Sequence, residues 1–235
     1  MKIFSNLSLN HSNKTRLKRE IKFVIIHYTG MQSEIESIKR LKSRNYKVSC
    51  HYLINRKGEI IQMVNDKNIA WHAGKSKWKK FINLNDNSLG IELVNKGHQF
   101  GYQNFSIKQI NSLIKLCKKL KKEYFIKKEN FLGHSDIAPL RKMDPGEKFP
   151  WKRLSSHNLG KWYVENKLKC KFNPKQIEIL FYKNLLKLGY RYFSVKKRKS
   201  TDKKIIKSFQ QHYLPYQVTG KIDQKTFEIS HLLTH

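Results

Sequence analysis

Residues 131–151, FLGHSDIAPLRKMDPGEKFPW, restrict the possible folds of this chain more than any other segment. The segment contains two glycines and three prolines, and proline removes an amide donor and clashes with the preceding helical turn. One continuous helix is therefore excluded, and we expect an irregular loop. His134 and Asp144 lie on this loop, and both side chains are ligands that zinc accepts in proteins. A polar surface loop is the alternative, so the rest of the chain has to supply a third ligand.

The composition is that of a folded but strongly basic protein. A chain of 235 residues can form one large domain, or one medium and one small domain. Hydrophobic residues make up 39% and aromatic residues 12%, which is enough for a packed core. There are 49 lysines and arginines against 17 acidic residues, a formal charge of +32. Such a charge favours nucleic acid, anionic lipid or anionic cell-wall polymer, although a compositional bias without a partner is the alternative.

The termini and cysteines bear on localisation. Three cysteines, Cys50, Cys117 and Cys170, are too few for a disulfide framework and suit a reducing compartment. Residues 1–19 are polar, contain no apolar run of signal-peptide length, and are predicted to be a flexible arm. No apolar run is long enough to span a membrane. The default expectation is a cytoplasmic protein, and an export route without such a signal would place it in the cell envelope or periplasm.

Strands are predicted where β-branched and aromatic residues gather between turn signals. His27 directly follows the apolar run at residues 21–26, at the end of a strand, where open α/β sheets place functional groups. A histidine there also fits an ordinary core position. The other strands are expected at residues 48–54, 59–64 and 88–95, with a hairpin turn at residues 55–58.

Two further features suggest a site. Glu92 lies in an otherwise apolar strand, where a buried carboxylate is costly unless it is paired or protonated. Either the side chain faces water, or it lies in a site with His27 and His134 and has a raised pKa. The loop AWHAGKSKW at residues 70–78 carries two tryptophans beside a glycine, which suits a groove that stacks on sugar or peptide. Ordinary loop packing is the alternative.

Helices are predicted from caps and apolar faces at residues 33–44 and 106–125. With the strands, they indicate an α/β fold with a mixed central β-sheet flanked by helices, at residues 20–155. A polar linker is expected at residues 156–173. Three short amphipathic helices then predict a small all-α three-helix domain at residues 174–235.

Six ordered motifs resemble the type-2 N-acetylmuramoyl-L-alanine amidases, zinc enzymes related to phage amidase-lysozymes and animal peptidoglycan recognition proteins. The motifs are HYTG at 27, HYLI at 51, GEIIQMV at 58, AWHAG at 70, SLGIELVN at 88 and GHSDIAPLRKMDPG at 133. The resemblance implies that residues 20–155 form a zinc amidase catalytic domain. The last 60 or so residues resemble a small three-helix peptidoglycan-binding module, through LLKLGY at 185, IIKSFQQHYLPYQVTGKID at 205 and the following KTF.

The resemblance also implies the site. It places one zinc ion on His27, His134 and Asp144, and it places Glu92 and Lys142 in the catalytic centre. Phage relatives have a catalytic tyrosine at the position of Cys50, so Glu92 is expected to be the acid–base group here, as in the bacterial branch. Candidates for gripping sugar and stem peptide are Trp71, His72 and Arg141.

The expected function is hydrolysis of the amide between N-acetylmuramic acid, or its anhydro form, and L-alanine of the peptidoglycan stem peptide, in cell-wall degradation or recycling. The expected partners are peptidoglycan or muropeptides, and the protein is expected to be a monomer. A non-catalytic peptidoglycan receptor is one alternative, but receptors of this superfamily typically lose a zinc ligand and all three are present. A specific nucleic-acid binder is the other, and no binding motif accompanies the charge.

Overall fold

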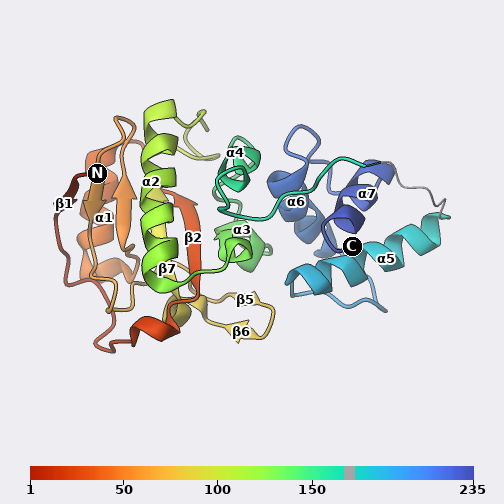
Figure 1. Ribbon diagram of the computed structural model, residues 1–235, viewed down its shortest axis with the longest axis horizontal. Helices are drawn as coiled ribbons and strands as arrows, with labels where there is room; N and C mark the ends of the chain where they lie inside the picture. Colours follow the sequence, from red (N-terminus) through yellow and green to blue (C-terminus); the bar gives the residue numbers. More distant parts are fainter. Residues whose placement is uncertain (167–172) are drawn as a thin grey trace.

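A computed structural model describes residues 1–166 and 173–235 of the chain (Figure 1). Its centre is a six-stranded sheet in the order β1-β4-β3-β7-β2-β8. Neighbouring strands are parallel except for the antiparallel pair β3–β4, which confirms the predicted mixed sheet. The strands are β1 (Ile3–Ser5), β2 (Phe23–Tyr28), β3 (Tyr52–Ile54), β4 (Ile60–Gln62), β7 (Ser88–Leu93) and β8 (Phe131–Gly133), with a separate hairpin of β5 (Lys77–Trp78) and β6 (Phe81–Ile82).

The helices lie on both sides of this sheet and beyond its β8 edge (Figure 1). The α-helices are α1 (Glu34–Lys42), α2 (Ile107–Tyr124), α3 (His134–Ile137), α4 (Trp151–Ser155), α5 (Pro174–Leu188), α6 (Asp202–Tyr213) and α7 (Gln224–Leu232). Short 3-10 helices occur at Lys18–Glu20, Arg44–Tyr46, Leu84–Asn87 and Lys128–Asn130. None of the helices in these described ranges is long and apolar enough to cross a membrane.

The predicted caps explain where the helices begin and end. Ser33 and Glu36 form the expected capping box of α1, and the Ser106 side chain accepts the amide of Gln109 at the start of α2. Helix α2 ends at Phe125, whose backbone is left-handed. At the start of both helices, a side chain satisfies an amide that has no partner within the helix.

The two faces of the sheet have different covers. Val24 and Ile26 of β2 pack into one core with the apolar side of α2. Phe23 and Ile25, which alternate with them and point to the opposite face, belong to a second core that includes side chains of α5 and α6. His27 follows in the same alternation, so it faces the side of the sheet that carries the C-terminal helices.

Residues 1–19 do not form the predicted flexible arm. Strand β1 pairs with β4 at the edge of the sheet, and Asn10 and Arg16 are buried. The Arg16 guanidinium donates to the carbonyl groups of Asn85 and Ser88 at 2.9 and 2.7 Å. The polar side chains of this segment form hydrogen bonds to backbone groups of the domain. These bonds join segments that are distant in the sequence, so the sequence alone does not reveal them.

Residues 131–151 are also more regular than predicted. The first three residues form β8, and His134 begins the four-residue helix α3. The stretch as a whole is not one helix, as the prolines require, and the Asp144–Pro145 peptide bond is cis. Only the connection between α3 and α4 is an irregular loop.

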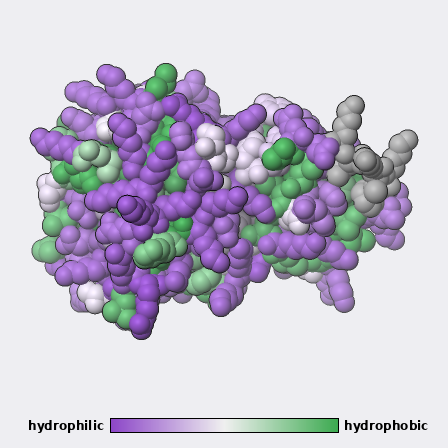
Figure 2. Space-filling view, in the orientation of Figure 1, coloured by the Kyte–Doolittle hydropathy of each residue, from purple (hydrophilic) through white to green (hydrophobic). Residues whose placement is uncertain are grey.

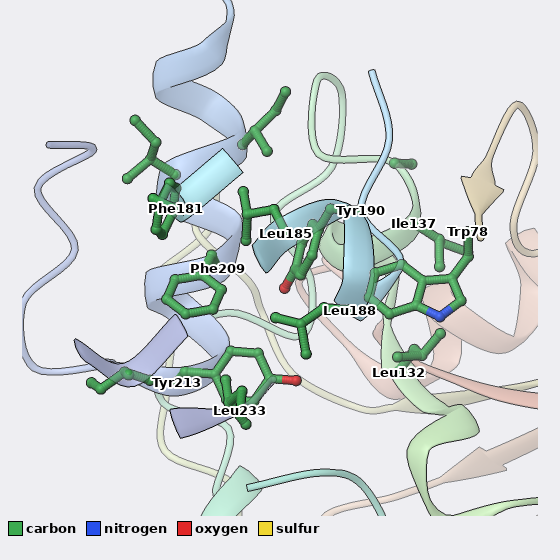
Figure 3. Close-up of a cluster of buried hydrophobic side chains, with 14 of the residues drawn as sticks. Trp78, Leu132, Ile137, Phe181, Leu185, Leu188, Tyr190, Phe209, Tyr213 and Leu233 are labelled. Carbon is green, nitrogen blue, oxygen red and sulfur yellow. The ribbon is translucent and has the colours of Figure 1, made fainter. Parts of the chain in front are cut away.

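The C-terminal helices begin and end as predicted, but they are joined closely to the sheet. Pro174 is the first residue of α5, Gly189 follows its last, and the Asp223 side chain caps α7. Figure 3 shows Leu185, Leu188 and Tyr190 beside Trp78, Leu132 and Ile137 of the N-terminal part, within one buried cluster. Hydrophilic side chains cover most of the face of both parts that Figure 2 shows.

Part of the predicted linker is packed against the rest of the protein. Leu159 and Tyr163 are buried, and the Trp162 and Tyr163 rings stack with centroids 5.2 Å apart. Residues 167–172 of the predicted linker, with Cys170, lie outside the described residues. That residues 174–235 form a separate domain that binds peptidoglycan stays a prediction.

Candidate active site

A cavity of about 900 Å³ opens at the carboxyl ends of the parallel strands. His27 of β2 lies in register with Glu92 of β7, so their side chains are neighbours on one face. His134 follows Gly133, the last residue of β8, which pairs with Ile26. All eight residues predicted for the site line this cavity: His27, Trp71, His72, Glu92, His134, Arg141, Lys142 and Asp144.

His27, His134 and Asp144 converge at the floor of the cavity. Nδ1 of each histidine lies 3.0 Å from Oδ2 of Asp144, and the two Nδ1 atoms lie 3.0 Å apart. All three side chains are buried, and their ligand atoms lie within 4.8 Å of one another. This is the geometry of a group that can hold one metal ion.

The opposite nitrogen of each imidazole has its own partner, which fixes the ring. His134 Nε2 donates to the Ala73 carbonyl at 3.1 Å, and His27 Nε2 lies 3.0 Å from Nδ1 of His72. The Nδ1 lone pairs are thus left to face one another and the carboxylate. Metal-binding histidines are usually held in this way by a hydrogen bond at the second nitrogen.

The donor set fits zinc. Two imidazole nitrogens and one carboxylate oxygen are a common set for a zinc site with an open position. Ligands about 2.0 to 2.1 Å from a tetrahedral zinc lie about 3.3 Å apart, which is close to the 3.0 Å separations here. Two nitrogen lone pairs at that distance repel one another unless a cation or a proton lies between them.

The electrostatics favour the protonation states that a metal needs. Burial and the neighbouring His134 lower the pKa of His27 to about 4, against the hydrogen bond and charge of Asp144. Burial alone would raise the pKa of Asp144, but His134 and His27 outweigh it and hold that pKa well below its usual range. A neutral imidazole and an ionised carboxylate are the forms that bind a metal.

His72 contacts His27, and its predicted part in binding substrate stays a prediction. Its ring is buried, Nδ1 faces His27, and Nε2 lies 3.2 Å from Oγ of Ser88. The Ser88 hydroxyl in turn donates to the Leu84 carbonyl. Donation therefore runs in one direction, from His27 to His72 to Ser88, and this direction leaves Nδ1 of His27 unprotonated. Burial and the nearby His27 hold the pKa of His72 well below its usual value.

The sequence of β7 makes room for this arrangement. Ser88, Gly90 and Glu92 point to the site, while Leu89, Ile91 and Leu93 alternate toward α2. A Cβ at position 90 would lie 2.3 Å from the His72 ring, so only glycine allows the imidazole to lie against the strand. The pattern SLGIEL is therefore a small or polar face on one side and an apolar face on the other.

Glu92 does not face open solvent. Its side chain is 8% exposed, and Oε2 has no hydrogen-bond partner among the described residues. Burial and the charge of Asp144 raise the pKa of Glu92 to about 8, against the charge of Lys142. A buried carboxyl group in a cavity with its pKa near neutrality is suited to proton transfer.

The other predicted residues differ in what they can do. Lys142 is exposed at the cavity and makes no side-chain hydrogen bond within the described ranges. Trp71 is half-buried, with part of its surface available in the wall. Arg141, a candidate for gripping sugar and stem peptide, donates to backbone groups: Nε to the Lys75 carbonyl at 3.0 Å and NH2 to the Ala73 carbonyl. Its guanidinium thus holds the loop that orients His134. The role of Arg141 in binding substrate stays a prediction.

Some cavity residues were not predicted from the sequence. The Tyr28 hydroxyl lies 2.9 Å from Nδ1 of His98, whose Nε2 lies 3.1 Å from Glu147. Burial and the charge of Asp144 raise the pKa of Tyr28 to about 12, so it stays a hydroxyl. Tyr28 stands in the HYTG motif beside His27, a signal that could have found it. His98 lies in a polar loop that carries no such signal.

Cys50 stands where phage relatives have a catalytic tyrosine, and it lies away from the cavity. The thiol is fully buried, packs beside Met63, and is not part of the cavity wall. Burial raises the pKa of Cys50 well above its ordinary value. Glu92 is therefore the one candidate of the two with access to a substrate.

The fold and site were compared with known proteins. The pattern of the N-acetylmuramoyl-L-alanine amidase family matches residues 17–147. The N-acetylmuramoyl-L-alanine amidase AmiD of Escherichia coli K12 is 35% identical over 240 residues, covering 91% of this chain and 82% of that protein. The 1,6-anhydro-N-acetylmuramyl-L-alanine amidase AmpD of Haemophilus influenzae is 42% identical over 112 residues, 47% of this chain and 58% of that one.

Solved structures agree over nearly the whole chain. The complex of E. coli AmiD with the substrate anhydro-N-acetylmuramic acid-L-Ala-D-gamma-Glu-L-Lys superposes with a TM-score of 0.80 at 31% identity, covering 94% of this chain and 91% of that one. AmpDh3 of Pseudomonas aeruginosa gives 0.78 at 28% identity, with 95% and 94% covered. The likeness therefore includes the C-terminal helices.

Two buried histidines and an aspartate that could hold a metal ion lie beside a buried glutamate at the carboxyl ends of a mixed sheet, and this combination is typical of the active site of a hydrolase. Within that class, the chain belongs to the N-acetylmuramoyl-L-alanine amidase family. It is an amidase of that family, and the alternatives of a non-catalytic receptor and a nucleic-acid binder are not needed.

Proposed function

We propose that this amidase uses one zinc ion, held by His27, His134 and Asp144, to cleave the amide between N-acetylmuramic acid, or its anhydro form, and L-alanine of the stem peptide. The reaction would serve cell-wall degradation or recycling. The convergence of the three ligand atoms within 4.8 Å carries this proposal. The substrate in the complex of E. coli AmiD, an anhydro-N-acetylmuramic acid peptide, supports the choice of bond.

Each residue has a distinct part in the reaction. A zinc ion bound here supplies Lewis-acid activation of water and of the amide carbonyl. The Glu92 carboxylate accepts the proton of the attacking water and then returns it to the leaving alanine nitrogen. The Lys142 ammonium stabilises the negative charge that develops on the carbonyl oxygen. The products are the free lactyl carboxylate and the free peptide amine.

The cavity wall supplies the binding contacts. The half-buried face of Trp71 can stack on a sugar ring or peptide. The Tyr28 hydroxyl, held by His98, is a further group at the cavity that can hydrogen-bond to substrate.

The proposal is tested with the purified full-length protein on a soluble anhydro-muropeptide and on intact sacculi, with mass analysis of the products. We expect free peptides that begin with L-alanine, loss of activity after treatment with a chelator, and recovery when about one equivalent of zinc is returned. A protein that is folded and loaded with zinc but releases no such peptide from either substrate would overturn the proposal.

A further inference from the structure

The connection between the two ligands His134 and Asp144 is held from outside by the C-terminal helices. Ser135 donates its amide to the Asp144 carbonyl at 2.8 Å, so the two ends of the connection are already tied together. Three residues of this connection, Ser135, Asp136 and Leu140, accept hydrogen bonds from the C-terminal part of the chain. Figure 1 shows α3 next to α6, and these two helices are in direct contact.

Asp136 is the centre of these contacts. Its side chain is 1% exposed, and Oδ2 accepts the amide of Gly133 at 2.7 Å, which fixes the first turn of α3. Tyr190 donates its hydroxyl to Oδ1 at 2.6 Å, and His212 donates Nδ1–H to Oδ2 at 2.8 Å. A buried carboxylate is costly without such donors, and two of its three donors come from residues 54 and 76 positions further along the chain.

The donors are themselves fixed by packing. Tyr190 is fully buried, and its ring meets Trp78 edge-on with centroids 4.9 Å apart. The ring of His212 stacks on Trp151 of α4 at 3.9 Å with an interplanar angle of 11°. The position of the Asp136 carboxylate therefore depends on where the C-terminal helices lie.

A second pair of contacts acts on the same connection. The Ser208 hydroxyl of α6 donates to the Ser135 carbonyl at 2.8 Å, in a buried position. Gln211, also of α6, donates to Glu147 at 3.2 Å, three residues beyond the ligand Asp144. Helix α6 thus contacts the chain just after one ligand and just after the other.

We infer that Tyr190, Ser208 and His212 are positioning residues of the metal centre, which act through Ser135 and Asp136 to hold His134 and Asp144 in the arrangement that binds zinc. The C-terminal helices are then a structural part of the active site, whether or not they also bind the cell wall. This inference rests on the proposed function, because it assigns these residues to the proposed zinc site. Polar groups that orient metal ligands typically change metal affinity by about 10- to 100-fold when they are removed.

The test uses the full-length protein and measures its zinc dissociation constant by competition with a chelator. The variants are Tyr190→Phe and Ser208→Ala, each of which removes one hydroxyl and keeps the packing. Tyr182→Phe is the matched control: Tyr182 is a buried tyrosine of α5 that is 1% exposed, and its ring faces Arg198, not α3. Thermal unfolding of the zinc-free variants is measured in parallel.

We expect Tyr190→Phe and Ser208→Ala to weaken zinc binding about tenfold or more, while Tyr182→Phe binds as the parent does. Zinc affinities within twofold of the parent in both variants, with only the melting temperature lowered, would show a purely structural contact and overturn the inference. A parent protein that binds zinc in that same experiment leaves the proposed function intact. A parent that binds no zinc would remove both.

Discussion

At the scale of single residues, Glu92 and Lys142 differ from the three proposed metal ligands in the contacts that their side chains make. Glu92 is buried with an unpaired Oε2, and Lys142 lies exposed at the cavity. Neither belongs to the ligand group. Under the proposed function, their contribution to the reaction can therefore be removed without removing the zinc ion.

We predict that Glu92→Gln and Lys142→Met retain zinc and fold but lose activity by about a hundredfold or more each, as expected for a general base and an oxyanion donor. The two losses should not add in the double variant, because both groups act on one transition state. Rate assays and zinc analysis measure this. Glu165→Gln and Lys152→Met, two exposed positions, are the controls and should be near normal. A near-normal rate in Glu92→Gln would move the acid–base role elsewhere.

The same carboxyl group predicts a pH dependence of stability. Burial raises the pKa of Glu92 from 4.5 to about 8, so the folded state binds this proton more tightly than the unfolded state does. The stabilisation from that proton is fully present below about pH 4.5 and is lost as the pH rises to about 8. In chelator-treated protein, Glu92→Gln should therefore gain stability relative to the parent over that range.

The free energy of unfolding of both proteins is measured in denaturant at several pH values between 4.5 and 8.5. Glu165→Gln serves as the control and should track the parent at every pH, because residue 165 is exposed. If the curves of the parent and Glu92→Gln stay parallel across the range, Glu92 keeps an ordinary pKa, and its assignment as a buried proton carrier loses its electrostatic support.

At the scale of elements, the position of strand β7 relative to the 72–73 loop sets the geometry of the histidines. The His72 ring orients His27, and the Ala73 carbonyl orients His134. The backbone amides of His72 and Ala73 donate to Oδ1 of Asn85, at 3.0 and 2.6 Å respectively. One short loop therefore orients both His27 and His134. Gly90 leaves the space that the His72 ring of this loop occupies.

We predict that Gly90→Ala lowers both stability and zinc affinity, because the new methyl group would overlap the His72 ring. His72→Ala should weaken zinc binding as well, since it removes the acceptor for His27. In the double variant the methyl group meets no ring, so its loss of stability should be clearly smaller than the sum of the two single losses. Denaturant unfolding of the four proteins measures this coupling. Additive losses would mean that the glycine serves another purpose.

Some of these elements could be predicted from the sequence and others could not, and the difference has a physical reason. Local signals were enough for α1, α2 and the C-terminal helices, whose caps and apolar faces lie within each segment. His27 and Glu92 could be brought together because strand ends meet at one sheet edge. Strand β1 has only three residues, and its pairing with β4 is a contact between distant segments. The hydrogen bond between Tyr190 and Asp136 likewise joins distant segments, and the sequence around neither residue predicts it.

At the scale of the whole molecule, the two parts of the chain are not as independent as their sequences suggest. The sequence favours a catalytic part that works alone and a helical part that tethers it to the wall. In the structure, Phe23, Ile25 and Leu132 of the sheet share one buried core with side chains of α5 and α6. Gly189 also lies against Trp78, where a Cβ would approach to 2.4 Å. This contact is as close as the packing inside a single domain.

We therefore predict that a chain ending at Lys161 loses function instead of keeping it. Removal of the helices would expose Phe23, Ile25, Leu132 and Trp78 to water, and exposing fully buried side chains of this size costs about 1.5 to 3 kcal/mol each. It would also leave the Asp136 carboxylate without two of its donors. The shortened chain should be poorly soluble or unfold at a lower temperature, and it should bind zinc weakly.

Solubility, thermal unfolding, zinc content and activity on a small soluble muropeptide are compared for the full and the shortened chain. A small substrate is needed because it makes no use of a wall tether, so any loss of rate belongs to the active site itself. Phe209→Ala in the full chain is a milder companion, since it opens the same core at a fully buried side chain and should cost about 3 to 5 kcal/mol. A shortened chain that is folded, loaded with zinc and active on the soluble substrate would show that the helices serve only to tether the enzyme.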